Sequence, residues 1–123
     1  MLPSLRRWPS RTTGRKQPLG PERNHCELTG VIHSLETIRL TPAGAPTRRL
    51  WLEHRSRQEE GGAPREVQAR MAVMLVGEAL VSQSRQLAEG QRILVQGFLA
   101  RAGFRGEARD RLQLHATRFE CFD

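Results

Sequence analysis

The feature that most constrains this chain of 123 residues is a series of five stretches in which apolar and polar residues alternate with a period of two. That period is typical of strands that bury one face and expose the other. In the first stretch, four residues would share the buried face: Cys26, Leu28, Gly30 and Ile32. The other strands are expected at about 47–56, 66–76, 91–100 and 111–122. Leu50 and Leu52 on the second strand, and Ile93 and Val95 on the fourth, are expected to point inward. Gly30, in mid-strand, predicts a bend or bulge.

One helix interrupts this series, at 77–90. Ala79, Leu80 and Leu87 would form its short apolar face, and Gly90 would end it. The helix therefore falls between the third and fourth strands. Five strands with a helix at that point are the order of an OB-fold, a small closed barrel. The sequence thus predicts an all-β domain over residues 24–123, built as a five-stranded OB-fold barrel with one short helix.

Residues 1–23 differ in composition from the rest of the chain. They hold six basic residues, one acidic residue and four prolines, with almost no apolar periodicity, which predicts a disordered basic tail. The tail supplies +5 of the formal net charge of +7, so the predicted barrel is nearly neutral and must place its positive charge locally. Nearly all the basic residues are Arg, whose planar fork suits phosphates and base faces. Nucleic acid and anionic membranes are the two candidate partners of such a chain.

Several other classes of protein find no support in the sequence. No stretch approaches the length of a membrane-spanning helix, and the first residues lack the apolar core of a signal peptide. Cys26 and Cys121 form no disulfide pattern, so a reducing cytoplasm is the expected location. The four histidines are scattered and no catalytic motif occurs. We therefore expect no enzyme activity, metal or cofactor.

Four segments of the chain resemble one known family. LEHRSRQEEGG at 52–62 is the most specific, and LTGVIHS at 28–34, VQGFLA at 95–100 and LQLHA at 112–116 follow the same order as in that family. A TPAG-like turn at 41–44 also matches. The family is the bacterial primosomal replication protein N, PriB, a relative of single-stranded DNA-binding protein. The resemblance covers residues 24–122.

This resemblance implies a homodimeric OB-fold that binds single-stranded DNA and helps to restart stalled replication forks. Its implied partners are the primosomal helicase and a helicase-loading protein, and its implied location is the bacterial cytoplasm, in association with the nucleoid. The chain departs from the family at two positions: well-known members carry a Trp on the third strand and a Phe in the loop before it, both implicated in DNA contact, whereas this chain has Gln68 and Ala63 there. DNA binding that depends mainly on charge is therefore expected.

Single-strand binding requires a positive groove and flat side chains on which bases stack. The loop at 101–110 and the residue after it supply the expected DNA contacts: Arg101, Phe104, Arg105, Arg109 and Arg111. The family's binding loop is basic too, and Arg105 and Arg111 occupy matching places. The alternative is a flexible solvated hairpin. Trp51 and Phe98 alternate outward from their strands and are further DNA-binding candidates, although either would also suit a subunit interface.

The charged run at 53–60 predicts a protein interface rather than a DNA surface, because its three glutamates would repel phosphate. Glu53, His54 and Arg55 are its candidate residues for a dimer or partner contact, with a solvated hairpin as the alternative. Two further functions remain open beside single-stranded DNA binding. One is an adaptor that binds proteins through the barrel with little DNA affinity, and the other is an RNA-binding OB-fold.

Overall fold

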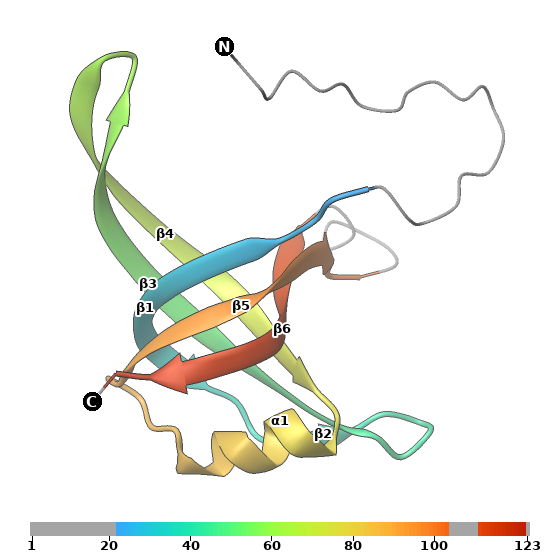
Figure 1. Ribbon diagram of the computed structural model, residues 1–123. Helices are drawn as coiled ribbons and strands as arrows, with labels where there is room; N and C mark the ends of the chain where they lie inside the picture. The colour runs from blue at the N-terminus through green and yellow to red at the C-terminus, as the bar shows by residue number, and fades with distance from the viewer. Residues whose placement is uncertain (1–21, 104–110, 123) are drawn as a thin grey trace, which may run out of the picture.

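A computed structural model describes residues 22–103 and 111–122 of the chain (Figure 1). In this structure six strands form one sheet that closes into a barrel. Five of them confirm the predicted strands, and the sixth, β2, was not predicted. The strands are β1 (Cys26–Leu35), the two-residue β2 (Arg39–Leu40), β3 (Pro46–Glu60), β4 (Ala63–Val76), β5 (Arg92–Arg101) and β6 (Leu112–Cys121). The short helix α1 (Glu78–Gln83), followed by the single turn η2 (Ser84–Gln86), lies between β4 and β5 and covers one end of the barrel.

The sheet runs in the order β1-β5-β6-β4-β3-β2, and β1 closes it by pairing with β3 as well. The first half of β1 pairs antiparallel with β5, from Cys26 to Val31. From Val31 to Leu35, β1 pairs antiparallel with β3. The pairing of β4 with β6 is the one parallel contact among the described strands. This arrangement confirms the predicted OB-fold barrel.

Gly30 lies where β1 passes from one neighbour to the other. A Cβ atom at this position would lie 2.6 Å from the carbonyl oxygen of Glu53 and 2.9 Å from Cγ of Leu52. Only glycine allows the two backbones to approach so closely. The bulge that was predicted near Gly30 occurs slightly later, between Ile32 and Ser34. The glycine thus permits the close approach, and the bulge produces the change of register.

A second glycine, Gly97, has the same role between β5 and β6. The register of this pair shifts between Gln96 and Gly97, at a bulge. A Cβ atom on Gly97 would overlap the carbonyl oxygen of His115. The backbones of β5 and β6 are therefore in direct contact where the barrel wall bends.

The core lies inside the barrel and confirms the alternation read from the sequence. Leu50, Leu52, Ile93 and Val95, all predicted to point inward, are completely buried. The rest of the buried apolar cluster is Ile32, Val73, Leu75, Val81, Leu87, Leu114, Ala116 and Phe119. Removing such side chains from water is the main favourable contribution to a fold of this size.

The helix differs from its prediction. It ends at Gln83 rather than near Gly90, and a single 3-10 turn replaces its second half. Ala79, which was predicted to lie on the apolar face of the helix, is exposed. Val81 is buried in the core instead. Ser84 explains the change of helix type: its buried hydroxyl donates to the carbonyl of Val81 at 2.6 Å, in local competition with the α-helical pattern.

The hairpin of β3 and β4 is longer than predicted. The strands were expected to end near residue 56 and to begin again near 66, but pairing continues to Glu60 and Ala63. The turn consists of Gly61 and Gly62 alone, with φ of 61° and 83°, which suits a tight two-residue connection. The hairpin projects beyond the barrel (Figure 1). Two ion pairs bridge its strands, from Arg65 to Glu60 at 2.6 Å and from Arg70 to Glu53 at 2.8 Å.

Two predictions concern segments that the structure describes only in part. The basic tail at 1–23 lies outside the described residues except for Glu22 and Arg23, so its disorder stays a prediction. The loop at 101–110 is described only as far as Gly103. No helix among the described residues is long and apolar enough to cross a membrane.

Candidate nucleic-acid interface

OB-folds bind ligands on the outer face of their second and third strands, between the loop that joins the first two strands and the loop that joins the last two. In this chain those strands are β3 and β4. The two loops are the segment 36–45, which contains β2, and the segment 102–111. Because Leu50 and Leu52 point into the core, Arg49, Trp51 and Glu53 lie on the outer face of β3. This face is therefore the expected ligand face of the barrel.

Trp51 is held in a small polar cluster on that face. Its indole Nε1–H donates to Oε2 of Glu36 at 3.0 Å, and Nε of Arg49 donates to the same oxygen at 3.1 Å. These hydrogen bonds, first from Arg49 and then from Trp51, lower the pKa of Glu36. The Arg49 guanidinium carbon lies 5.8 Å from the centre of the indole ring, within range of a cation–π contact. The indole is thus half-buried and fixed in direction, beside a guanidinium group that is partly exposed.

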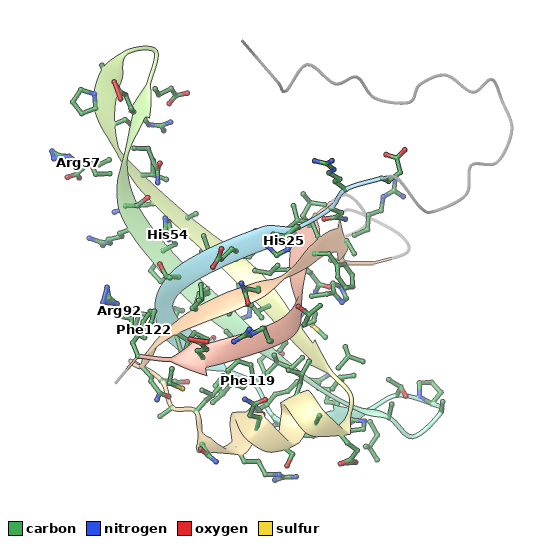
Figure 2. All side chains as sticks on the ribbon, in the orientation of Figure 1. His25, His54, Arg57, Arg92, Phe119 and Phe122 are labelled. Carbon is green, nitrogen blue, oxygen red and sulfur yellow. The ribbon has the colours of Figure 1, made fainter. Side chains whose placement is uncertain are left out.

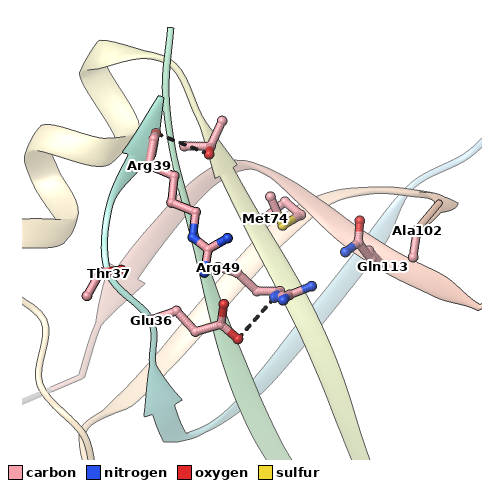
Figure 3. Close-up of a pocket in the computed structure, with 8 residues that line it drawn as sticks. Glu36, Thr37, Arg39, Arg49, Met74, Ala102 and Gln113 are labelled. Carbon is pink, nitrogen blue, oxygen red and sulfur yellow. Dashed lines mark hydrogen bonds and ion pairs between the residues drawn. The ribbon is translucent and has the colours of Figure 1, made fainter. Parts of the chain in front are cut away.

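A pocket of about 240 Å³ opens next to this cluster (Figure 3). It lies at the junction of the two loops with β3, β4 and β6, which is the usual ligand position in the fold. Its lining residues are Glu36, Thr37, Arg39, Thr47, Arg49, Met74, Ala102 and Gln113. Charged groups lie on one side of the pocket and Met74 and Gln113 on the other (Figure 3). None of these eight residues was among the sites predicted from the sequence.

The predicted DNA-binding loop borders the same pocket. Arg101 ends β5 and Arg111 precedes β6, and the backbone N–H of Ala102 donates to the carbonyl of Arg111 at 2.8 Å. The structure therefore brings Arg101 and Arg111 together at the base of the loop, both exposed. The other three predicted contacts, Phe104, Arg105 and Arg109, lie outside the described residues.

Phe98 lies on the outer face of β5, as predicted. Its side chain is 41% exposed, and its ring stacks on that of His115 with 5.3 Å between centres and 8° between planes. Burial lowers the pKa of His115, so the imidazole is neutral at pH 7. Strand pairing continues the row from His115 to Met74 and from Met74 to Arg49. Phe98 is therefore joined to the pocket by an uncharged stripe.

Two of the three predicted interface residues, Glu53 and His54, form hydrogen bonds within the chain. Glu53 accepts a hydrogen bond from Nε of Arg70 at 2.8 Å, which lowers the pKa of Glu53. His54 bonds to the carbonyl oxygen of Thr29 at 2.7 Å through Nδ1 and to Oγ of Ser56 at 2.8 Å through Nε2. Nδ1 must donate to the carbonyl, so His54 ties the base of the hairpin to β1. Arg55 is exposed.

The two family positions that differ in this chain both lie on the hairpin. Ala63 pairs with Glu60 at its tip, and Gln68 pairs with Arg55 further down. Both residues are exposed. Neither Ala63 nor Gln68 offers a ring on which a base stacks. Trp51 and Phe98 lie on the barrel instead, and a further exposed ring, that of Phe122, follows the end of β6.

Charge distinguishes the barrel face from the hairpin. Between residues 53 and 70 the hairpin carries four glutamates and four arginines, which gives no net charge. Arg39 and Arg49 in the pocket lining, with Arg101 and Arg111 at the base of the adjoining loop, outnumber the single carboxylate of Glu36. Positive charge is therefore in excess at the pocket end of the sheet and balanced on the hairpin.

Sequence reasoning missed most of the pocket. Arg49 carries a usable signal, since it alternates with Leu50 and Leu52 in the same way as Trp51. Glu36, Met74 and Gln113 carry none, because they come from three distant segments that only the closed barrel brings together. Within the described residues, no group of three or more His, Cys, Asp or Glu side chains forms a metal site.

Comparison with known proteins agrees with the geometry. Residues 24–118 match a family described as another single-strand binding protein family. Replication restart protein PriB of Actinobacillus succinogenes is 33% identical over 100 residues, covering 81% of this chain and 92% of that protein. The Vibrio cholerae PriB is 36% identical over 95 residues, covering 77% and 94%. This chain belongs to the PriB family. The solved PriB of Ralstonia solanacearum, with a TM-score of 0.72 and 24% identity, covers 83% of the chain and 100% of its own length, and supports the PriB fold.

Proposed function

We propose that this PriB-family chain is a single-stranded DNA-binding accessory protein of the replication-restart primosome, which assists reloading of the replicative helicase at stalled forks. Membership of a single-strand binding family and the identity to replication restart proteins support this function. The observation that carries it is the group of four arginines at one end of the ligand face, beside the fixed indole of Trp51. Arg39 and Arg49 line the pocket, and Arg101 and Arg111 lie at the base of the loop that borders it. The role is binding rather than catalysis.

The geometry suggests how a strand is held. Arg39, Arg101 and Arg111 are exposed and have room to contact successive phosphates. Bases on the other side of the strand meet Trp51 and, along the uncharged stripe, Phe98. Each stacked base contributes about 1–3 kcal/mol in single-strand binding. Every nucleotide presents a phosphate and a base with a flat ring face. Binding of this kind is therefore expected to have little sequence preference.

A titration with labelled oligonucleotides tests the function. Oligo-dT, oligo-U and duplex DNA of equal length are added at two salt concentrations, and the change in anisotropy is recorded. We expect oligo-dT to bind more tightly than the duplex, and its affinity to fall steeply with salt. Tighter binding of oligo-U would instead favour an RNA-binding OB-fold, and binding of no oligonucleotide at either salt concentration would favour the protein-binding adaptor.

A homodimer is the second part of the proposal. Between Cys26 and Gly30, β1 is paired with β5 on one side only among the described strands, and an open strand edge is a template for pairing with another chain. His54, at the base of the projecting hairpin, bonds to the carbonyl oxygen of Thr29 in this part of β1 (Figure 2). We expect sedimentation at micromolar concentration to show a species of twice the 14.0 kDa chain mass. A single species of 14.0 kDa would contradict the dimer.

The remaining partners follow from the proposed role. A restart primosome requires contacts with the primosomal helicase and with a helicase-loading protein, and the balanced charges of the hairpin suit such protein contacts better than DNA. We propose the bacterial cytoplasm, in association with the nucleoid, as the location. Residues 1–23, with six basic residues, would add non-specific affinity for DNA to that of the barrel.

A further inference from the structure

Gln113 is the starting point for an inference that rests on the proposed function and deepens it. Its side chain lines the pocket from β6 and is only 7% exposed. We infer that the pocket receives one unstacked base of the bound single strand, whose edge forms hydrogen bonds with the Gln113 amide. None of the residues that line this base-binding pocket was predicted from the sequence to contact DNA.

The side-chain amide of Gln113 lacks a hydrogen-bond partner among the described residues. Gln113 and Ser84 are the two buried polar side chains among the described residues. The hydroxyl of Ser84 is satisfied, since it donates to Val81 and accepts from Nη1 of Arg48 at 3.2 Å. Within the described part of the chain, no hydrogen bond is formed by the amide of Gln113. The amide atoms of Gln113 are not among the fully buried atoms that lack a partner, and Nε2 of His115 is the one such atom among the described residues. The amide end is therefore accessible from the pocket, where a ligand can supply the donor and acceptor groups that it lacks within the chain.

The chemistry of the amide itself suits the edge of a base. A primary amide presents one acceptor oxygen and two donor hydrogens side by side. Every nucleobase presents a donor next to an acceptor on its pairing edge, so the amide can form two hydrogen bonds with it. The oxygen and nitrogen of the amide exchange places by rotation about the last side-chain bond. Gln113 can therefore bind bases of different kinds, in agreement with binding that has little sequence preference.

The size and lining of the pocket suit a single base. A volume of about 240 Å³ is below the range of about 300–1,000 Å³ that is usual for drug-sized ligands, and it suits one heterocycle. Met74, next to Gln113, offers a polarizable thioether to the flat face of a ring. Arg39 and Arg49 border the opposite side, where the phosphates on either side of an inserted base would lie.

The charge of Glu36 fits this arrangement. Its carboxylate would repel a phosphate, yet it lies in the pocket wall. Its Oε2 fixes the directions of Arg49 and Trp51, so that both groups are positioned before DNA arrives. The base-binding pocket would thus give this chain a base contact on the barrel, in place of the aromatic residues that are absent from the hairpin at Ala63 and Gln68.

The test compares oligo-dT with a strand of the same length in which every base is replaced by an abasic sugar. The two strands carry equal phosphate charge, so any difference in affinity comes from the bases. We expect the wild-type chain to bind oligo-dT about five- to tenfold more tightly than the abasic strand. Gln113→Met keeps the length of the side chain and removes the amide, and it should lower this ratio at least about threefold. Gln68→Met, an exposed residue on the hairpin, is the matched control and should leave the ratio unchanged.

A second measurement does not depend on affinity. The side-chain amide signals of Gln113 are assigned in a ¹⁵N NMR spectrum by their loss in Gln113→Met, and they should shift when oligo-dT is added but not when the abasic strand is added. Equal wild-type affinity for both strands, or amide signals that do not move, would overturn the base-binding pocket and leave the proposed DNA binding intact. Failure of the wild-type chain to bind oligo-dT at all would overturn both.

Discussion

Replacing Arg39, Arg101 and Arg111 together by alanine is expected to weaken oligo-dT binding at least tenfold, which corresponds to about 1.4 kcal/mol. Arg39 lines the pocket, and Arg101 and Arg111 lie at the base of the loop that borders it. None of the three side chains takes part in a hydrogen bond or ion pair with another described residue. Removing three phosphate contacts should lower the slope of log affinity against log salt by roughly 2, at about 0.7 for each contact. The thermal unfolding temperature should change little, because exposed side chains contribute little to stability.

A matched variant separates position from charge. Arg85, Arg92 and Arg118 are also exposed, and their replacement by alanine removes the same formal charge. Arg92 begins β5 whereas Arg101 ends it, so the two lie at opposite ends of the strand. We expect the control to weaken binding by less than about threefold, through the change in overall charge alone. Equal losses in both variants would mean that binding depends on net charge rather than on the pocket face.

Gly97→Ala is expected to reduce the free energy of unfolding by at least about 3 kcal/mol. The added methyl group would overlap the carbonyl oxygen of His115, which belongs to the backbone of β6 and cannot move without disturbing the barrel wall. The two strands would have to separate where the bulge already weakens their pairing. Urea unfolding followed by circular dichroism measures the loss, and a variant as stable as the wild type would show that the strands are not in such close contact.

Gly44→Ala provides the comparison for this measurement. Gly44 has a positive φ of 91°, but a Cβ atom there meets no atom within 4 Å. The expected cost is the conformational strain alone, about 1–2 kcal/mol. A similar cost for both variants would indicate that the effect at Gly97 is also one of backbone conformation rather than of overlap.

The barrel was predictable because its strands follow a local rule. Alternation placed Leu50, Leu52, Ile93 and Val95 correctly in the core, since side chains on a strand point to opposite faces in turn. The helix was predicted at the right place but too long. Apolar spacing indicated Leu80 and Leu87, but it does not report that the Ser84 hydroxyl binds the backbone and that the chain leaves the helix there.

The hairpin and the pocket could not be predicted in the same way. Pairing beyond residue 56 is bridged by the ion pair of Arg65 with Glu60, and no alternation of apolar residues marks this part of the hairpin. The pocket joins the segment after β1 to β4 and β6, so its shape exists only after the barrel has closed. Nothing in the sequence distinguishes Gln113 from other polar residues on a strand. Its side chain becomes buried only when the barrel has closed.

The double pairing of β1 also determines how the chain must fold. β3 and β4 form a hairpin of neighbouring segments and can pair early, whereas Cys26 has to find Gly97 across most of the chain. Closing so long a loop costs entropy before the new contacts stabilise it, so contacts of this kind make folding slow. During synthesis, β1 waits with one edge unpaired until β5 has left the ribosome, and in that interval it is open to association with other chains.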